Sequence, residues 1–195
     1  MVGGALSADG VYVGTMETGR FVHTGGGVTT GVLEVGSGGS YEYIGGTLEV
    51  NGLLALGGTM DFGGTASTVA LGDGAWADLS SATVANAEAA NLTCGADSLT
   101  IVASGQDPST MFGSYSTSGM IHEKGSTLVI PAGTSLVLRQ DFADHVQVAG
   151  SLVRATNEDR AKLTSGVSVE AGGHGDIHQV QVADQASGNA GGELQ

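Results

Sequence analysis

The stretch that decides the fold is Tyr41-Glu-Tyr-Ile-Gly-Gly-Thr-Leu-Glu-Val-Asn-Gly52. Apolar and polar side chains alternate on both sides of the Gly45-Gly46 pair, which is the pattern of short extended strands. Glycine adopts positive φ angles without steric cost, so the pair and the following Asn51-Gly52 supply corners. The stretch therefore predicts strands of a few residues that are interrupted by sharp turns.

The same pattern occurs once before in the chain. The segment Phe21–Thr30 aligns with Tyr41–Val50, so that aromatic residue matches aromatic residue, glycine pair matches glycine pair, and Val28 matches Leu48. The two copies are separated by about 20 residues, which is the range in which a repeat forms one coil of a stacked solenoid.

A degraded third copy follows, in which Phe62-Gly-Gly-Thr65 matches Ile44-Gly-Gly-Thr47. Three copies of a strand-and-corner unit favour an all-β, right-handed β-solenoid or β-helix over a sandwich or barrel. We expect this body to cover residues 1–153.

Other segments extend the all-β prediction. Further strands are predicted at Leu99–Val102, 127–130, 135–138, 145–148 and 151–153. The alanine-rich segment Ala75–Ala90 fits either one helical turn or the edge of a coil. Residues 106–119, which contain Asp107-Pro108, are expected to form a loop.

The sequence changes character at Arg154. Four charged residues gather within 156–163, which fits a short helix or a charged loop, and strands are expected near 167–169 and 177–182. An open solenoid needs protected ends. We therefore expect residues 154–195 to form a less regular cap or an assembly arm.

Composition excludes several classes of function. The chain has 35 Gly, 2 Pro and 5% aromatic residues, so its core must consist mainly of small aliphatic side chains. Its net charge of −14 opposes binding to nucleic acid, which requires clustered Lys and Arg. No apolar stretch is long enough for membrane insertion. The first six residues lack the basic region and apolar core of a signal peptide, so we expect a trimmed form or another export route.

The segment Tyr41–Gly52 resembles repeats of secreted proteins from planctomycetes and of autotransporter passenger regions. The later run Gly125–Gly133, which leads to 144–150, is similar to the same proteins. This resemblance implies a right-handed β-helical protein that is extracellular or at the cell surface. It implies no catalytic residues for this chain.

One group of residues has the composition of a metal site. In an extended strand, His174, Asp176 and His178 would project from one face, as three metal ligands must. The alternative is a solvated polar strand without fixed geometry. A divalent cation is thus the one cofactor that the sequence leaves open.

A second group has the composition of a catalytic site. The segment Asp141-Phe-Ala-Asp-His145 offers two carboxylates and a histidine, and sugar cleavage on a β-helix requires converging acidic groups. Solvated charges on a corner loop are the alternative that we favour. We also expect Cys94 to be a buried apolar residue and Tyr41, Tyr43 and Phe62 to pack in the core.

These observations predict a non-catalytic structural subunit of an extracellular fibre or surface layer. Exposed strand edges add strands from other chains, so the expected partners are copies of the same protein. The predicted contact residues lie in two edge segments: Val11, Tyr12, Val13, Ile177, Val180 and Val182. The alternatives are a virion component, such as a tail-fibre segment or capsid decoration protein, and a carbohydrate-active enzyme or binding module.

Overall fold

The computed structural model describes residues 3–154, 162–176 and 193–194. The chain divides into two compact units, Met1–Ile121 (unit 1) and His122–Gln195 (unit 2). This division lies about thirty residues before the boundary that the change of composition at Arg154 indicates. Each unit is described by itself.

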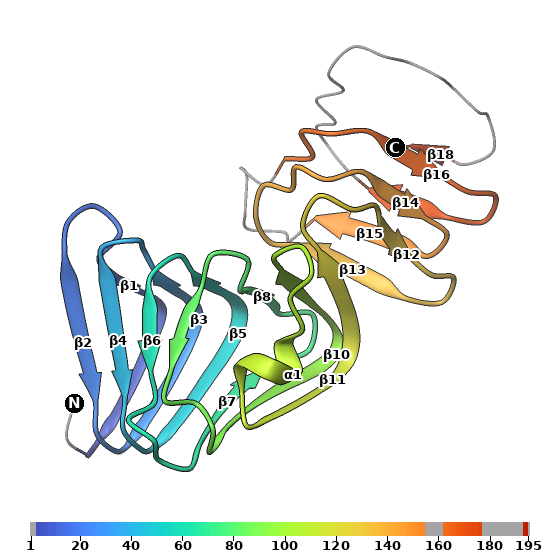
Figure 1. The fold of residues 1–195 in the computed structure, drawn as a ribbon. Helices are drawn as coiled ribbons and strands as arrows, with labels where there is room; N and C mark the ends of the chain where they lie inside the picture. Colours follow the sequence, from blue (N-terminus) through green and yellow to red (C-terminus); the bar gives the residue numbers. More distant parts are fainter. Residues whose placement is uncertain (1–2, 155–161, 177–192, 195) are drawn as a thin grey trace. The chain divides into compact units, whose positions relative to one another are not determined.

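Unit 1 consists of two sheets that the chain visits in turn (Figure 1). Sheet A contains β1 (Ala5–Val13), β3 (Gly27–Val35), β5 (Thr47–Leu56), β7 (Ser67–Leu71), β8 (Trp76–Asp78), β10 (Ala90–Val102) and β11 (Ser114–Glu123). Sheet B contains β2 (Gly19–His23), β4 (Gly39–Tyr43), β6 (Thr59–Asp61) and β9 (Thr83–Ala85).

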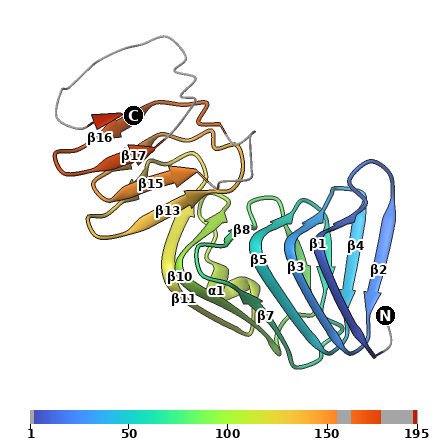
Figure 2. The same cartoon turned by 180° about the vertical axis from the view of Figure 1, so that it is seen from behind.

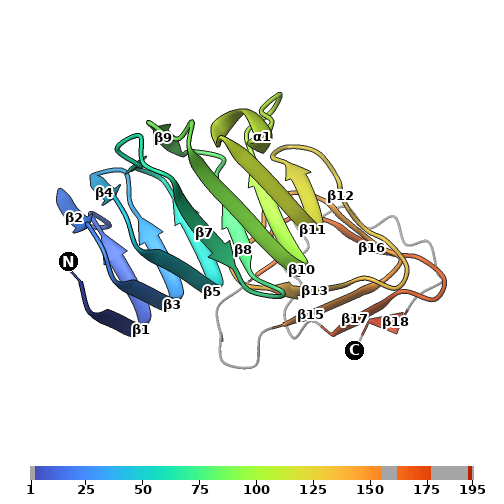
Figure 3. The same ribbon diagram turned by 90° about the horizontal axis from the view of Figure 1, so that it is seen from below.

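The first two coils each contribute one long strand to sheet A and one short strand to sheet B, and in the third coil β7 and β8 replace the long strand. The spatial order is β1-β3-β5-β7-β10-β11 in sheet A and β2-β4-β6-β9 in sheet B. The pairs from β1 to β10 and all pairs of sheet B are parallel. Figure 3 shows the sheet A strands side by side in this order. The predicted β-solenoid is thus confirmed.

The register confirms the alignment of the first two sequence copies. Phe21 pairs with Tyr41 in sheet B, and Val28 pairs with Leu48 in sheet A. The offset of 20 residues is therefore the length of one coil. Equivalent residues occupy the same position in neighbouring coils, as the repeat requires.

The alignment of the third copy is wrong. Thr47 pairs with Thr68 and not with Thr65. Met60 pairs with Tyr41, so in the same register Phe62 lies beside Tyr43 and not beside Ile44. The turn after β6 is longer than the turn after β4, and a match of glycine pairs alone does not detect this insertion.

Close backbone contacts explain the second glycine of the Gly57-Gly58 pair. A Cβ atom on Gly58 would overlap the carbonyl oxygens of Gly36 and Gly39, which belong to the preceding coil. Its neighbour Gly57 has ordinary space, with Val35 O at 3.5 Å from the position of a Cβ. The corners thus require glycine because neighbouring coils approach at backbone distance.

The interior of unit 1 is a set of side-chain columns that run across the coils. In sheet A, one column contains Leu48, Val69 and Leu92 with their equivalents in the first coils. In sheet B, the rings of Phe21 and Tyr41 stack at 5.0 Å. Tyr41, Tyr43 and Phe62 are fully buried, as predicted.

The structure decides between the two alternatives for Ala75–Ala90 in favour of the coil edge, and it corrects the loop predicted at 106–119. The alanine-rich segment contains β8 and β9 and no helical turn. The expected loop at 106–119 contains one helical turn, α1 (Pro108–Met111), and the first part of β11. Tyr115 in β11 donates a 2.9 Å hydrogen bond to Thr100 in β10, so pairing with the previous coil makes this polar segment a strand.

Unit 2 repeats the same principle with shorter strands (Figure 2). Sheet C contains β12 (Leu128–Ile130), β14 (Val146–Val148) and β16 (Val167–Val169). Sheet D contains β13 (Ser135–Leu138), β15 (Ser151–Arg154), β17 (His174–Asp176) and β18 (Glu193–Leu194). All pairs are parallel.

The predicted strands 127–130, 135–138, 145–148, 151–153 and 167–169 are all present. The coils continue beyond Arg154 into β16 and β17, so part of the expected cap belongs to the stack. The predicted strand at 177–182 and residues 156–161 of the charged segment 156–163 lie outside the described residues.

The corner contacts give a testable prediction. Gly58→Ala should lower the free energy of unfolding by about 1–3 kcal/mol, because the added methyl group must displace two carbonyl oxygens. Gly57→Ala is the matched control, which should change stability by less than about 1 kcal/mol. Urea unfolding followed by Trp76 fluorescence reports on unit 1. Equal effects of the two substitutions would contradict the close approach of the coils.

Candidate functional site

The predicted metal ligands are only partly covered by the structure. His174 is an exposed residue of β17, Asp176 ends that strand, and His178 lies outside the described residues. Within 3–154, 162–176 and 193–194, no three His, Cys, Asp or Glu residues gather as a metal site would require.

The predicted acidic segment is dispersed over separate turn contacts. Asp141 accepts a 2.8 Å hydrogen bond from the backbone N–H of Lys162, one coil further on. His145 is partnered with the Ser168 hydroxyl at 3.3 Å. Asp144 points to an earlier turn. The side chains thus connect neighbouring coils and do not converge on one point, as the corner-loop alternative requires.

Asp144 belongs to a polar cluster that the sequence did not indicate. Its carboxylate lies 2.7 Å from Nε2 of the buried His122 and accepts a 3.0 Å hydrogen bond from the N–H of Gly125. Nδ1 of His122 lies 3.4 Å from the hydroxyl of Ser126. The ring of His122 also packs on Phe142, with centroids 5.1 Å apart.

The cluster has the composition of a serine, histidine and acid triad but a different hydrogen-bond arrangement. The Ser126 hydroxyl donates to the carbonyl of Glu123 at 2.6 Å, so its proton points away from the imidazole. A serine nucleophile must instead give that proton to the histidine. The arrangement fixes the Glu123–Ser126 turn to the next coil. His122 and Asp144 are 22 residues apart, which is about one coil, so the coil spacing is the feature of the sequence from which this contact could have been predicted.

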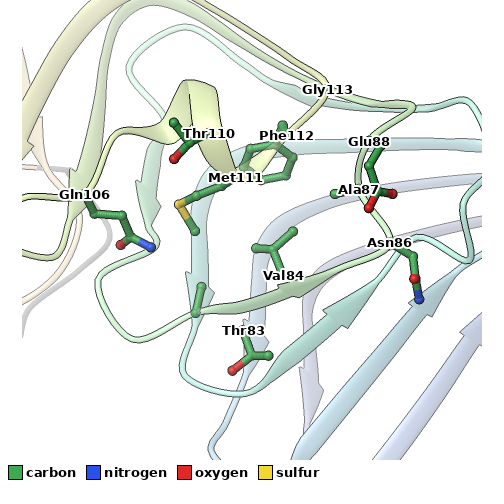
Figure 4. A pocket seen from close by; sticks show the side chains of 11 residues that line it. Thr83, Val84, Asn86, Ala87, Glu88, Gln106, Thr110, Met111, Phe112 and Gly113 are labelled. Carbon is green, nitrogen blue, oxygen red and sulfur yellow. The ribbon is translucent and has the colours of Figure 1, made fainter.

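A hollow of about 690 Å³ lies beside β9 (Figure 4). Val84 on the strand side faces Met111 and Phe112 on the α1 side, and Gln106 and Thr110 lie at the rim. The apolar middle continues the core, because Met111 and Val84 both pack against it. Its lining contains one carboxylate, Glu88, and no histidine or cysteine.

The clearest candidate site is the open end of the first coil. The β1 and β2 strands end sheets A and B, so within the described part of the chain only one edge of each is paired. The inward side chains Leu6, Ala8 and Phe21 are only partly buried, although they pack against the core. The interior columns of unit 1 are therefore incompletely covered at this end.

The predicted contact residues of β1 divide by orientation. Val11 and Val13 point into the core, with 9% and 6% of their surface exposed, whereas Tyr12 points outward and is 61% exposed. Met16, in the turn after β1, is 98% exposed. Two of the most exposed large apolar residues thus lie in the first coil. The predicted contacts Ile177, Val180 and Val182 lie outside the described residues.

Backbone groups of β1 also point outward. The N–H of Gly27 bonds to Gly4 O, and the N–H of Gly36 bonds to Val13 O. Because bonding direction alternates along a parallel strand, the N–H groups of Ser7 and Tyr12 point away from β3. These groups form a template for another strand.

The first coil lacks two of the usual protections of a sheet edge, proline and lysine. Neither β1 nor β2 contains proline or lysine, and proteins use both to block edge pairing. The one cation of β2, Arg20, is paired with Glu42 at 2.5 Å. This ion pair lowers the pKa of Glu42 and raises that of Arg20.

The opposite end of sheet B is closed. In the coil that follows β9, α1 replaces a strand, with Pro108 at its start and Asp107 as its N-cap. Phe112 completes the aromatic column by an edge-to-face contact with Phe62 at 5.9 Å. Unit 1 therefore has one closed and one open end of sheet B.

Cys94 is buried as predicted, with its thiol 3.7 Å from Thr100. Burial raises the pKa of this thiol, which keeps it protonated and unreactive. Among the described residues, no helix has the length and apolar character to cross a bilayer.

No protein-family model, curated protein or solved structure matches this chain. The resemblance to secreted bacterial repeats therefore stays a prediction.

The turn contacts of unit 2 give a second prediction. Asp144→Asn should lower the stability of unit 2 by about 1–3 kcal/mol, because it removes the charged acceptor of a buried histidine. Asp141→Asn, at an exposed turn, should cost less than about 1 kcal/mol. Trp76 and all four tyrosines lie in unit 1, so circular dichroism follows both units and Trp76 fluorescence follows unit 1 alone. A purely catalytic Asp144 would leave both curves unchanged.

Proposed function

We propose that this chain is a non-catalytic structural subunit that associates with copies of itself through the open end of its first coil. The observation that carries the proposal is the unpaired edge of β1 and β2 beside partly buried core residues. Extracellular location and a fibre or surface-layer role belong to the same proposal. Their support is the sequence resemblance.

Strand addition at this edge provides two favourable contributions. Backbone N–H and C=O groups gain hydrogen bonds, and the side chains of Leu6, Ala8 and Phe21 lose contact with water. Burial of apolar surface contributes about 25 cal/mol per Å². The exposed Tyr12 and Met16 enlarge the apolar area available to a partner.

Charge does not oppose contact at this end. Asp9 is the only charged side chain of β1, Glu17 adds one negative charge in the turn that follows, and the Arg20–Glu42 pair neutralises one charge of each sign on the outer face of sheet B. The net charge of −14 is therefore carried mostly elsewhere on the chain. The contact surface is close to neutral, while the rest of the molecule stays soluble.

The polar groups described above support the non-catalytic part of the proposal. The serine of the Ser126 cluster donates its proton to a carbonyl, and the carboxylates of Asp141 and Asp144 accept hydrogen bonds from separate turns. These contacts have a direct structural use within the coils.

The test introduces lysine at the edge. Ser7→Lys combined with Tyr12→Lys adds two charges to outward positions of β1 without altering the core. The double substitution should weaken self-association at least about tenfold, or 1.4 kcal/mol. Sedimentation velocity over a concentration series measures the association, and negative-stain microscopy shows the form of the assemblies.

The matched control places lysine on the same outward face of two inner strands, at Thr29 of β3 and Thr68 of β7. Thr68 of β7 is exposed and has paired strands on both sides. Thr68→Lys combined with Thr29→Lys should leave association within about twofold of the unmodified protein. A protein that stays monomeric at all concentrations, or equal effects of the two double variants, would refute the proposal.

A further inference from the structure

A histidine without a counter-ion lies in the interior of the first coil. His23, the last residue of β2, has 0% of its surface exposed. Its ring stacks on Tyr43 at a centroid distance of 4.9 Å and meets the edge of Tyr41 at 6.3 Å. The imidazole is thus one member of the aromatic column of sheet B.

The hydrogen bonds of His23 satisfy a neutral ring. Nδ1 lies 3.2 Å from the hydroxyl of Tyr41, and Nε2 lies 3.4 Å from the carbonyl of Gly26. With its proton on Nε2, the neutral ring donates to the carbonyl and accepts from the hydroxyl. A second proton on Nδ1 would turn the tyrosine bond into a meeting of two donors, unless the hydroxyl rotates.

Among the side chains that the structure describes, no charged group faces the ring to stabilise the protonated form. The inward side chains of β1, β3 and β4 are apolar or aromatic apart from Thr30, and the other buried polar residues described in unit 1 are Ser67, Ser98 and Thr100. The charged side chains on these strands belong to other positions: Asp9 on β1, Arg20 on β2, Glu34 on β3 and Glu42 on β4. Of these, Arg20 and Glu42 pair with each other.

Burial therefore lowers the pKa of His23 from its ordinary value of 6.5. The unfolded chain binds a proton at a higher pH than the folded chain does. The associated stability is complete above pH 6.5 and decreases as the pH falls from there toward the lower folded pKa.

The position of His23 limits where this cost acts. It belongs to β2, the terminal strand of sheet B, which has one neighbouring strand. A terminal coil can open while the following coils stay paired, because each coil contacts mainly its neighbours. The cost of burying a protonated His23 ring therefore disappears when the first coil alone opens.

We propose that His23 is an acid-sensitive lock on the first coil of unit 1. Near neutral pH the uncharged ring holds β2 against β4, and in acid its protonation raises the fraction of molecules in which β1 and β2 are open. This inference concerns the isolated protein. If the proposed self-association is also correct, the same opening removes the contact surface and dissociates the assemblies.

Hydrogen exchange at single-residue resolution tests the lock. Hydrogen exchange is compared between pH 7.5 and 5.0, after correction for intrinsic exchange rates. Opening measured at the amides of Phe21 and His23, which face β4, and of Val11 and Val13, which face β3, should rise by about tenfold if the pKa is lowered by one unit. The amides of Val69 and Leu92, in central strands, should show no such rise. An NMR titration of the His23 ring on the same sample measures its pKa directly.

Two variants separate titration from packing. His23→Phe keeps an aromatic ring in a column that already contains Phe62, and His23→Asn supplies a smaller polar side chain that does not titrate. Both should lack the acid-dependent opening, whatever their stability at pH 7.5.

The lock is refuted if the unmodified protein shows an ordinary His23 pKa, if central strands open equally, or if both variants retain the acid response. Acid-dependent opening in a protein that stays monomeric at all concentrations would refute the proposed assembly surface and leave the lock intact.

Discussion

The structure of this protein depends on the close approach of successive backbones at the corners of its coils. Gly58 lies against the carbonyl oxygens of Gly36 and Gly39 with no room for a Cβ. This contact keeps neighbouring coils at strand-pairing distance, so equivalent residues stack in columns such as Leu48–Val69–Leu92. The interior is therefore ordered along the stack, and each coil is covered by the next. A coil without a successor must be closed by another element or stay open.

Unit 1 shows both outcomes. At one end of sheet B, α1 and Phe112 replace the next strand and close the aromatic column. At the other end, Phe21 and Leu6 stay partly exposed, and within the described part of the chain one edge of β1 is unpaired. The proposed association and the proposed acid sensitivity follow from this same incompleteness. An uncovered coil can bind another strand, and it can also open independently of the rest.

The sequence predicted the coil but not its irregularities. The match of Phe21–Thr30 to Tyr41–Val50 is reproduced residue by residue, because glycine pairs fix the corners and alternation fixes the inward face. The third copy was misaligned since an insertion after β6 moves the pairing from Thr65 to Thr68. The strand character of 114–119 comes from pairing with the previous coil, which local composition does not record. The His122–Asp144 contact was missed for the same reason: its partners are one coil apart and belong to no local motif.

The alternation of hydrogen bonds in β1 allows a direct test of the central claim. The N–H groups of Ser7 and Tyr12 point away from β3, whereas those of Leu6 and Val13 point toward it. Amide exchange measured in dilute and in concentrated solution at neutral pH should show new protection at Ser7 and Tyr12 on concentration, with Leu6 and Val13 protected in both. Equal exchange of Ser7 and Tyr12 at all concentrations that support association would show that copies do not join through this edge.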